Sequence, residues 1–117
     1  MIIRKADVQD AFAICKISYE DLGYKCNDEL VKKRLINLDS RREVVFVAEI
    51  DNIFVGYIHA EIYNLLYYES MMNILGIAVS STYRRNGVGK ALMKWVISCH
   101  SCRDACPYNL GTENLLV

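Results

Sequence analysis

Two long apolar segments separated by only two residues constrain the fold of this chain more than any other feature. Residues 44–50 and 53–63 are rich in β-branched and aromatic side chains, and both residues between them, Asp51 and Asn52, tolerate a positive φ. The pattern predicts two antiparallel strands joined by a two-residue hairpin turn. Gly56 in the second strand marks either a bulge or a close approach of another backbone segment.

Two helices are expected between a short amino-terminal strand, residues 1–4, and this hairpin. Asp7 can cap the first helix, because its carboxylate can accept a backbone N–H bond from the first turn. Gly23 ends that helix, and Asn27 caps a second one that runs to about residue 38. Helical spacing predicts the following apolar face for the first helix: Val8, Phe12, Cys15, Tyr19 and Leu22.

A further strand and a further helix follow the hairpin. Residues 71–79 form a third long apolar segment, and residues 82–89 form a polar, basic loop that contains two glycines. Helical spacing then places the following residues on the buried face of a helix: Val88, Leu92, Trp95 and Cys99. The resulting order, β-α-α-β-β-β-α, predicts an α+β layer arrangement.

Length and composition indicate a single domain, residues 1–117, and argue against several classes of protein. With 117 residues, of which 53% are hydrophobic, the chain can bury one core but not two. Fourteen Lys and Arg balance fourteen Asp and Glu, whereas a protein that follows the phosphates of a nucleic acid needs a basic stripe. No segment of about 18 apolar residues is present, and no signal-peptide pattern is visible. We therefore expect a cytoplasmic protein with no nucleic-acid partner and no membrane contact.

The five cysteines are expected to be reduced thiols, because their number is odd and no secretory signal is visible. Cys15 and Cys26 are interpreted as small packing residues. Cys99, Cys102 and Cys106 lie close together and include a C-x-x-C spacing, which also occurs in metal sites. A structural zinc ion needs four ligands in an orderly arrangement, and the sequence has no second pair of this kind. No metal site is therefore expected.

The segment from residue 74 to residue 90 carries the strongest chemical signal. It joins an apolar strand to a helix through a loop that contains Arg84, Arg85, Gly87 and Gly89. The first N–H groups of a helix have no intrahelical acceptor and carry partial positive charge, and glycines let a ligand approach them closely. The arrangement suits a phosphate or pyrophosphate group. The alternative is that the glycines only tighten the turn and that both arginines are solvent-exposed charges.

The loop sequence from Arg84 to Gly89, RRNGVG, resembles the [R/Q]-x-x-G-x-[G/A] signature of the GNAT N-acetyltransferase superfamily. The resemblance extends to the preceding strand end, residues 77–83, and to the start of the following helix, residues 91–93. The upstream order of elements also agrees. The resemblance implies a GNAT-like α+β fold, in which helices flank a mixed, mainly antiparallel sheet. Residues 112–117 are expected to form a short fifth strand.

The same resemblance implies acetyl-CoA as co-substrate and an amine of a small molecule or a protein as acceptor. In this family the loop backbone holds the pyrophosphate of acetyl-CoA, which assigns these contacts to Arg84, Arg85, Asn86, Gly87, Val88, Gly89 and Lys90. The strand end is expected to pair its main chain with the amides of the pantetheine arm, through Ile77, Ala78 and Val79. The thioester would then lie near the middle of that strand.

A proton acceptor is needed, because an amine is protonated at neutral pH and must lose a proton before it attacks the thioester. Some members of the family carry a glutamate early on this strand, but the corresponding residue here is Asn73, whose amide cannot act as a base. Glu69, just before the strand, is predicted to take the role. His59, Glu61 and a water relay are the alternatives, and a solvated turn residue is the other interpretation of Glu69.

The carboxyl-terminal part departs from the family pattern. The sequence ends earlier than the usual single domain of the family, and Tyr108 lacks the context of the tyrosine that protonates the leaving thiolate. Two functions remain: an acetyl-CoA-dependent N-acetyltransferase, and a shortened GNAT-like module that binds CoA or dimerises with little or no turnover. An unpaired sheet edge would favour a homodimer with residues beyond Cys99 at or near the interface. Tyr63, Tyr67 and Tyr68 are candidates for the lining of an acceptor pocket.

Overall fold

The predicted hairpin forms the centre of a four-stranded sheet in the computed structural model, which describes residues 1–63, 65–68 and 71–101. β2 (Glu43–Ile50) and β3 (Ile53–Tyr63) are joined by Asp51 and Asn52, whose φ values are 52° and 65°. A turn with positive φ at both central positions matches the twist of the two strands. The hairpin prediction is therefore confirmed.

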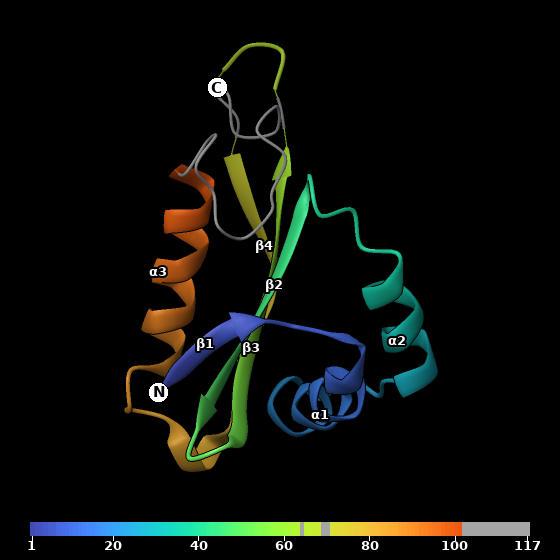
Figure 1. Cartoon of the computed structure of the whole chain (residues 1–117), viewed down its shortest axis with the longest axis vertical. Coiled ribbons are helices and arrows are strands. Elements are labelled where there is room, and N and C mark those ends of the chain that lie inside the picture. Colours follow the sequence, from blue (N-terminus) through green and yellow to red (C-terminus); the bar gives the residue numbers. More distant parts are fainter. Residues whose placement is uncertain (64, 69–70, 102–117) are drawn as a thin grey trace.

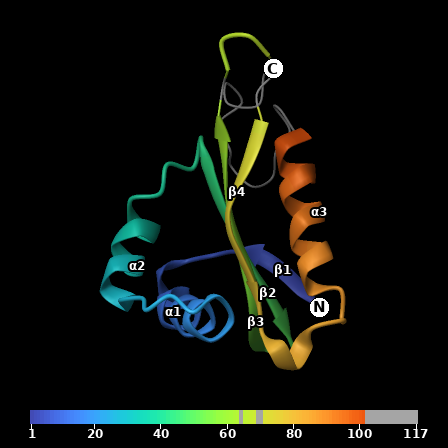
Figure 2. The same ribbon diagram turned by 180° about the vertical axis from the view of Figure 1, so that it is seen from behind.

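β1 (Ile2–Lys5) and β4 (Met71–Val79) complete the sheet in the order β1-β2-β3-β4, and each neighbouring pair is antiparallel. The helices form a layer on each side: α1 (Ala11–Ile17) and α2 (Asp28–Ile36) lie on one side and α3 (Val88–Ser101) on the other (Figure 1; Figure 2). The order β-α-α-β-β-β-α and the α+β class are as predicted. The expected fifth strand, residues 112–117, lies outside the described residues.

Two β-bulges interrupt the register of the sheet. Val55 has no partner in the β2–β3 register, and Leu75 has none in the β3–β4 register. An extra residue in one strand exchanges the faces on which the following side chains point, relative to a regular strand. The bulges therefore decide which side chains share a face of the sheet.

Gly56, immediately after the first bulge, lies directly against β4. A Cβ atom at this position would be 2.8 Å from the carbonyl oxygen of Ala78 and 3.2 Å from Cγ1 of Val88 in α3. Both expectations for Gly56, a bulge and a close approach, are therefore confirmed.

The main core lies between the sheet and α3. The Phe46 ring is fully buried there and contacts Trp95 edge to face, with 5.7 Å between the ring centroids. Val88, Leu92 and Cys99 are buried as predicted, and Trp95 is partly buried. This packing fixes α3, and therefore its first turn, against the sheet.

The first helix is less regular than predicted. It consists of a 3₁₀ turn, η1 (Val8–Asp10), then α1, then a π-helical turn, η2 (Ser18–Leu22). Asp7 caps it as expected, with its carboxylate accepting from the Gln9 N–H at 2.8 Å, and Gly23 ends it with a φ of 78°. Asn27 caps α2 in the same way, accepting from the Glu29 N–H at 2.8 Å, and α2 ends at Ile36 rather than near residue 38.

The predicted apolar face of the first helix is wrong. Phe12 and Tyr19 are exposed, and of the predicted face only Cys15 is buried. The residues that pack toward the sheet are Ala11, Ile14 and Ile17. The 3₁₀ and π turns change the rotation per residue, so one helical period does not apply across residues 8–22.

Candidate active site

The loop predicted to bind a pyrophosphate connects β4 to α3 through a 3₁₀ turn, η3 (Ser81–Tyr83). Arg85 and Gly87 have positive φ values of 70° and 77°. The Asn86 side chain donates from Nδ2 to the carbonyl oxygen of Tyr83 at 3.1 Å and so closes a tight turn. Because α3 begins at Val88, the N–H groups of its first turn have no intrahelical acceptor and are available to an anion.

A cavity of about 270 Å³ lies in this loop. Its lining residues are Val79, Tyr83, Arg84, Arg85, Gly87, Val88, Gly89 and Lys90. All of these except Tyr83 belong to the residues predicted to bind the cofactor. Ile77, Ala78 and Asn86, which were also predicted, do not line the cavity. The loop therefore gathers cationic side chains and helix N–H donors around one small space.

The two glycines of the loop differ in what the backbone requires. Gly87 has a φ that side chains rarely adopt, although a Cβ there would meet no atom within 4 Å. A Cβ at Gly89 would make only an ordinary contact, 3.8 Å from Cγ2 of Val79. The loop conformation therefore requires glycine at position 87 and tolerates alanine at position 89.

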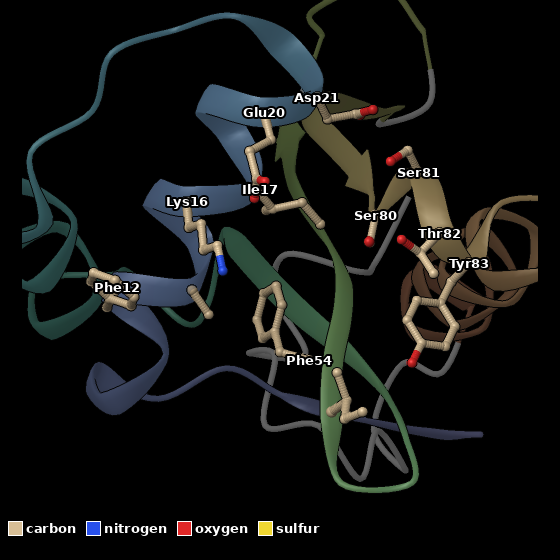
Figure 3. Close-up of a pocket in the computed structure, with 12 residues that line it drawn as sticks. Phe12, Lys16, Ile17, Glu20, Asp21, Phe54, Ser80, Ser81, Thr82 and Tyr83 are labelled. Atoms are coloured by element: carbon tan, nitrogen blue, oxygen red, sulfur yellow. The ribbon is translucent and has the colours of Figure 1, made fainter.

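Arg84 also forms an ion pair with a residue of the layer that contains α1, on the side of the sheet opposite α3. Its guanidinium forms an ion pair with Asp21 of η2, and the Asp21 side chain is only 14% exposed whereas that of Arg84 is 56% exposed. Asp21 belongs to the wall of a second cavity of about 470 Å³, between the first helix, the start of β3 and residues 80–83 (Figure 3). None of the predicted site residues lines this larger cavity, which borders the loop at Tyr83.

The two edges of β4 differ within the described part of the chain. Residues Ile77–Val79 pair with β3, and in the part of the chain that the structure describes no strand adjoins the outer edge of β4. Backbone groups directed to that edge can therefore pair with a ligand that carries amide groups.

Four polar side chains form a group on the α1 side of the sheet: Glu43 of β2, His59 and Glu61 of β3, and Asn73 of β4. His59 Nε2 lies 2.9 Å from Glu43 Oε1, and Asn73 Nδ2 donates to Glu61 Oε1 at 3.5 Å. The side chains of His59 and Glu43 are 31% and 28% exposed. This polar group adjoins apolar residues of the same face, such as Val45, that pack toward α1.

Tyr57 lies on the same face of the sheet as the polar group and belongs to the buried residues that pack against α1. Its hydroxyl lies 2.8 Å from Oγ of Ser18, and both residues are buried. The same hydroxyl would be 3.7 Å from a Cβ at Gly76, the β4 residue opposite His59. The hydroxyl pair thus anchors the first helix beside the middle of β4.

The remaining site predictions have different outcomes. Glu69, Cys102, Cys106 and Tyr108 lie outside the described residues, so the role of Glu69 stays a prediction. Tyr67 and Tyr68 are exposed.

Within the described segments, no cluster of three His, Cys, Asp or Glu side chains is arranged to hold a metal ion. No helix within the same segments combines the length and apolar character needed to cross a membrane.

Two residues of the site were missed by sequence reasoning, Asp21 and Glu43. Neither lies in a recognisable motif. Asp21 meets the loop only through the packing of the first helix, and Glu43 meets His59 only through the strand register.

The sequence of this chain matches the model of a known protein family. The model of the Acetyltransferase (GNAT) family matches residues 9–113. A search of curated proteins found no match.

Solved structures of acetyltransferases resemble the chain. A GNAT family acetyltransferase from Staphylococcus aureus is 27% identical, with a TM-score of 0.69 over 83% of this chain and 75% of that one. NAA60 from Arabidopsis thaliana, in complex with a bisubstrate analogue, is 20% identical, with a TM-score of 0.66 over 86% of this chain and 66% of that one. An aminoglycoside antibiotic 6'-N-acetyltransferase from Acinetobacter haemolyticus is 16% identical, with a TM-score of 0.70 over 84% and 70%. The last two likenesses concern the fold alone. The family match over most of the sequence shows that the chain belongs to the GNAT family of acyltransferases.

Proposed function

We propose that this chain is an N-acetyltransferase that transfers the acetyl group of acetyl-CoA to a primary amine of a small molecule or a protein. The observation that carries the proposal is the 270 Å³ cavity, which Arg84, Arg85 and Lys90 line together with Val88 and Gly89 at the start of α3. Cationic side chains together with free helix N–H groups suit a pyrophosphate. The names of two structural relatives, an N-acetyltransferase of aminoglycosides and a protein bound to a bisubstrate analogue, are consistent with an amine acceptor.

Acetyl-CoA would bind in two parts. Its pyrophosphate would lie against the first turn of α3, at Val88, Gly89 and Lys90, with Arg84 and Arg85 beside it. Its pantetheine arm would follow the open edge of β4 along Ile77, Ala78 and Val79. The thioester would then reach the middle of β4, close to Gly76.

In the transfer, the amine nitrogen attacks the carbonyl carbon of the thioester. A C–N bond forms, the C–S bond breaks, and the sulfur leaves with its electron pair and takes up a proton. The amine is protonated at neutral pH, so a base must accept a proton before or during the attack. Glu69 is the base that the sequence predicts.

A second candidate function is a GNAT-like module that binds CoA or dimerises with little turnover. Asn73 favours it, because a neutral amide lies at the β4 position that resembles the one where some members of the family carry a glutamate base. Under either function we propose a cytoplasmic homodimer, since the edge of β4 that no strand of the described residues adjoins is a template for strand pairing. Light scattering tests the dimer, and a monomer at micromolar concentration contradicts it.

The test of the cofactor site is a titration of the protein with acetyl-CoA, together with a thiol-release assay on a panel of amines. Gly89→Asp places a carboxylate at the proposed pyrophosphate site and should weaken acetyl-CoA binding at least about tenfold, or about 1.4 kcal/mol. Gly89→Ala is the matched control, because the backbone tolerates a Cβ there. Unchanged binding in a folded Gly89→Asp variant contradicts the assignment of the loop.

A further inference from the structure

We infer that His59 accepts the proton of the acceptor amine and that Glu43 holds the imidazole in the tautomer that can do so. The inference rests on the proposed function, because it assigns one step of that reaction. Neither residue lies in the β4–α3 loop, where we propose that the pyrophosphate of acetyl-CoA binds.

The hydrogen bond between the two side chains defines their roles. His59 Nε2 lies 2.9 Å from Glu43 Oε1. When Nε2 carries the proton of this bond, Nδ1 keeps a lone pair and is the atom that can accept a proton. A carboxylate that orients a histidine in this way also stabilises the imidazolium that forms. Glu43 is therefore a positioning residue, and His59 is the proton acceptor.

The strand register places the imidazole near the proposed thioester. His59 pairs with Gly76 of β4, next to the bulge at Leu75. Opposite residues of an antiparallel pair have Cα atoms about 4.5–5.5 Å apart. Gly76 has no side chain, and among the described residues a Cβ there would come within 4 Å of the Tyr57 hydroxyl alone, at 3.7 Å. No side chain of β4 therefore separates His59 from the open edge along which the pantetheine arm would run.

The charges around His59 suit a cationic acceptor. Glu43 on β2 and Glu61 on β3 share its face of the sheet, and Tyr57 on β3 is a further titratable residue of that face. On β4, Gly76 and the neutral Asn73 lie on this face, and the Asn73 side chain donates to Glu61. Two carboxylates attract an ammonium group, so the acceptor arrives protonated and gives its proton to the imidazole directly or through one water.

The first experiment compares His59→Gln with His100→Gln, since the chain has two histidines. Acetyl-CoA affinity is measured by titration, and kcat/KM is measured with a polyamine, an aminoglycoside and peptides that carry a free amino terminus or lysine. His59→Gln should lower kcat/KM by about 10²–10⁴ and change the acetyl-CoA Kd by about twofold or less. The defect should shrink toward pH of about 10, where the amine loses its proton to water.

The second experiment tests the positioning role of Glu43 without relying on activity alone. In a His100→Gln background, the ¹⁵N spectrum of the remaining imidazole should show the tautomer protonated at Nε2, and Glu43→Gln should remove this preference. Glu43→Gln should also lower kcat at least about tenfold, with little effect on KM for the amine. Glu29→Gln, in a surface pair with Lys32 on α2, is the matched control and should change neither property.

The outcomes separate the inference from the proposed function. If the wild-type protein transfers acetyl groups and His59→Gln retains more than about a third of kcat/KM, the inference is overturned and the proposed function stands. Loss of activity in Glu69→Gln but not in His59→Gln assigns the proton acceptor to Glu69 and also overturns it. If the wild-type protein binds acetyl-CoA but acetylates no amine, the proposed function fails and the inference fails with it.

Discussion

Arg84, at the entrance of the β4–α3 loop, pairs with Asp21 in the π-helical turn that ends the first helix. The pair connects the β4–α3 loop to the helix layer that contains α1, on the side of the sheet opposite α3. Its two members differ in burial, because the Asp21 side chain is 14% exposed and the Arg84 side chain is 56% exposed. Removing Arg84 therefore leaves a mostly buried carboxylate, whereas removing Asp21 leaves a guanidinium that is more than half exposed.

Arg84→Met should destabilise the protein more than Asp21→Asn does. The first substitution leaves a mostly buried carboxylate without its cation, which costs about 1–3 kcal/mol. The second leaves a guanidinium that water can solvate, and the cost should stay below about 1 kcal/mol. Urea unfolding measures both differences.

Arg85→Met is the control for this pair, because it removes an exposed arginine of the same loop and leaves the backbone strain unchanged. Its effect on the free energy of unfolding should lie within about 0.5 kcal/mol of zero. Equal costs for Arg84→Met and Asp21→Asn would show that the burial of Asp21 does not determine the energetics of the pair.

Gly56→Ala should disturb the junction of β3, β4 and α3. The added Cβ would lie 2.8 Å from the Ala78 carbonyl oxygen, a backbone atom, and 3.2 Å from Cγ1 of Val88. Relieving this overlap requires β4 or the start of α3 to shift, at a cost of about 1–3 kcal/mol. Both segments border the β4–α3 loop, where we propose that acetyl-CoA binds, so acetyl-CoA binding should weaken together with stability.

Thermal unfolding and acetyl-CoA titration measure the two effects of Gly56→Ala. Gly89→Ala is again the control, because its Cβ has room. A Gly56→Ala variant with wild-type stability would mean that the β3–β4 contact is looser than the structure indicates.

Asp10 should make stability depend on pH in the acid range. It accepts two hydrogen bonds from Arg4, both at 2.8 Å, and one from the Asp7 N–H at 2.8 Å. Burial by itself raises the pKa of Asp10, but these hydrogen bonds and the Arg4 charge outweigh it, so the pKa lies below its usual value. The folded state therefore binds this proton less readily than the unfolded state does.

The stabilisation from Asp10 is thus fully present above the usual aspartate pKa of about 4, and it is lost as the pH falls through the lower pKa of the folded state. Asp10→Asn should flatten the decline of Tm between pH of about 5 and 2. Asp51→Asn, in the hairpin turn, is the control, since asparagine also adopts a positive φ. An unchanged acid profile in Asp10→Asn contradicts the prediction.

The parts of the site that sequence predicted are contiguous in the chain. The loop predicted to bind the cofactor runs without interruption from β4 into α3, and its glycines and arginines lie within a few residues of one another. Local turn chemistry and the first turn of a helix therefore place most of these groups around one cavity. No long-range packing has to be known for this prediction.

The pairing of His59 with Glu43 depends instead on one extra residue. Next to the turn, Ile50 pairs with Ile53, and an unbroken register from there would place Val44 opposite His59. The bulge at Val55 shifts the pairing by one residue, so that Val45 lies opposite His59 and Glu43 shares its face. Gly56 indicates a bulge in the sequence, but it does not specify which strand gains the residue.

Cys26 should be the reactive thiol of the amino-terminal half. Burial, a hydrogen bond with the Cys26 thiol and the charge of Asp28 together raise the pKa of Cys15 to about 12, so Cys15 is a neutral thiol at pH of about 8. Cys26 is exposed and Cys99 is buried. Iodoacetamide should therefore alkylate Cys26 in the folded protein and leave Cys15 and Cys99 unmodified, as measured by peptide mass spectrometry in a Cys102→Ser/Cys106→Ser background. Unfolding in urea should make all three react, and alkylation of Cys15 as fast as that of Cys26 in the folded protein would refute the burial of Cys15 within α1.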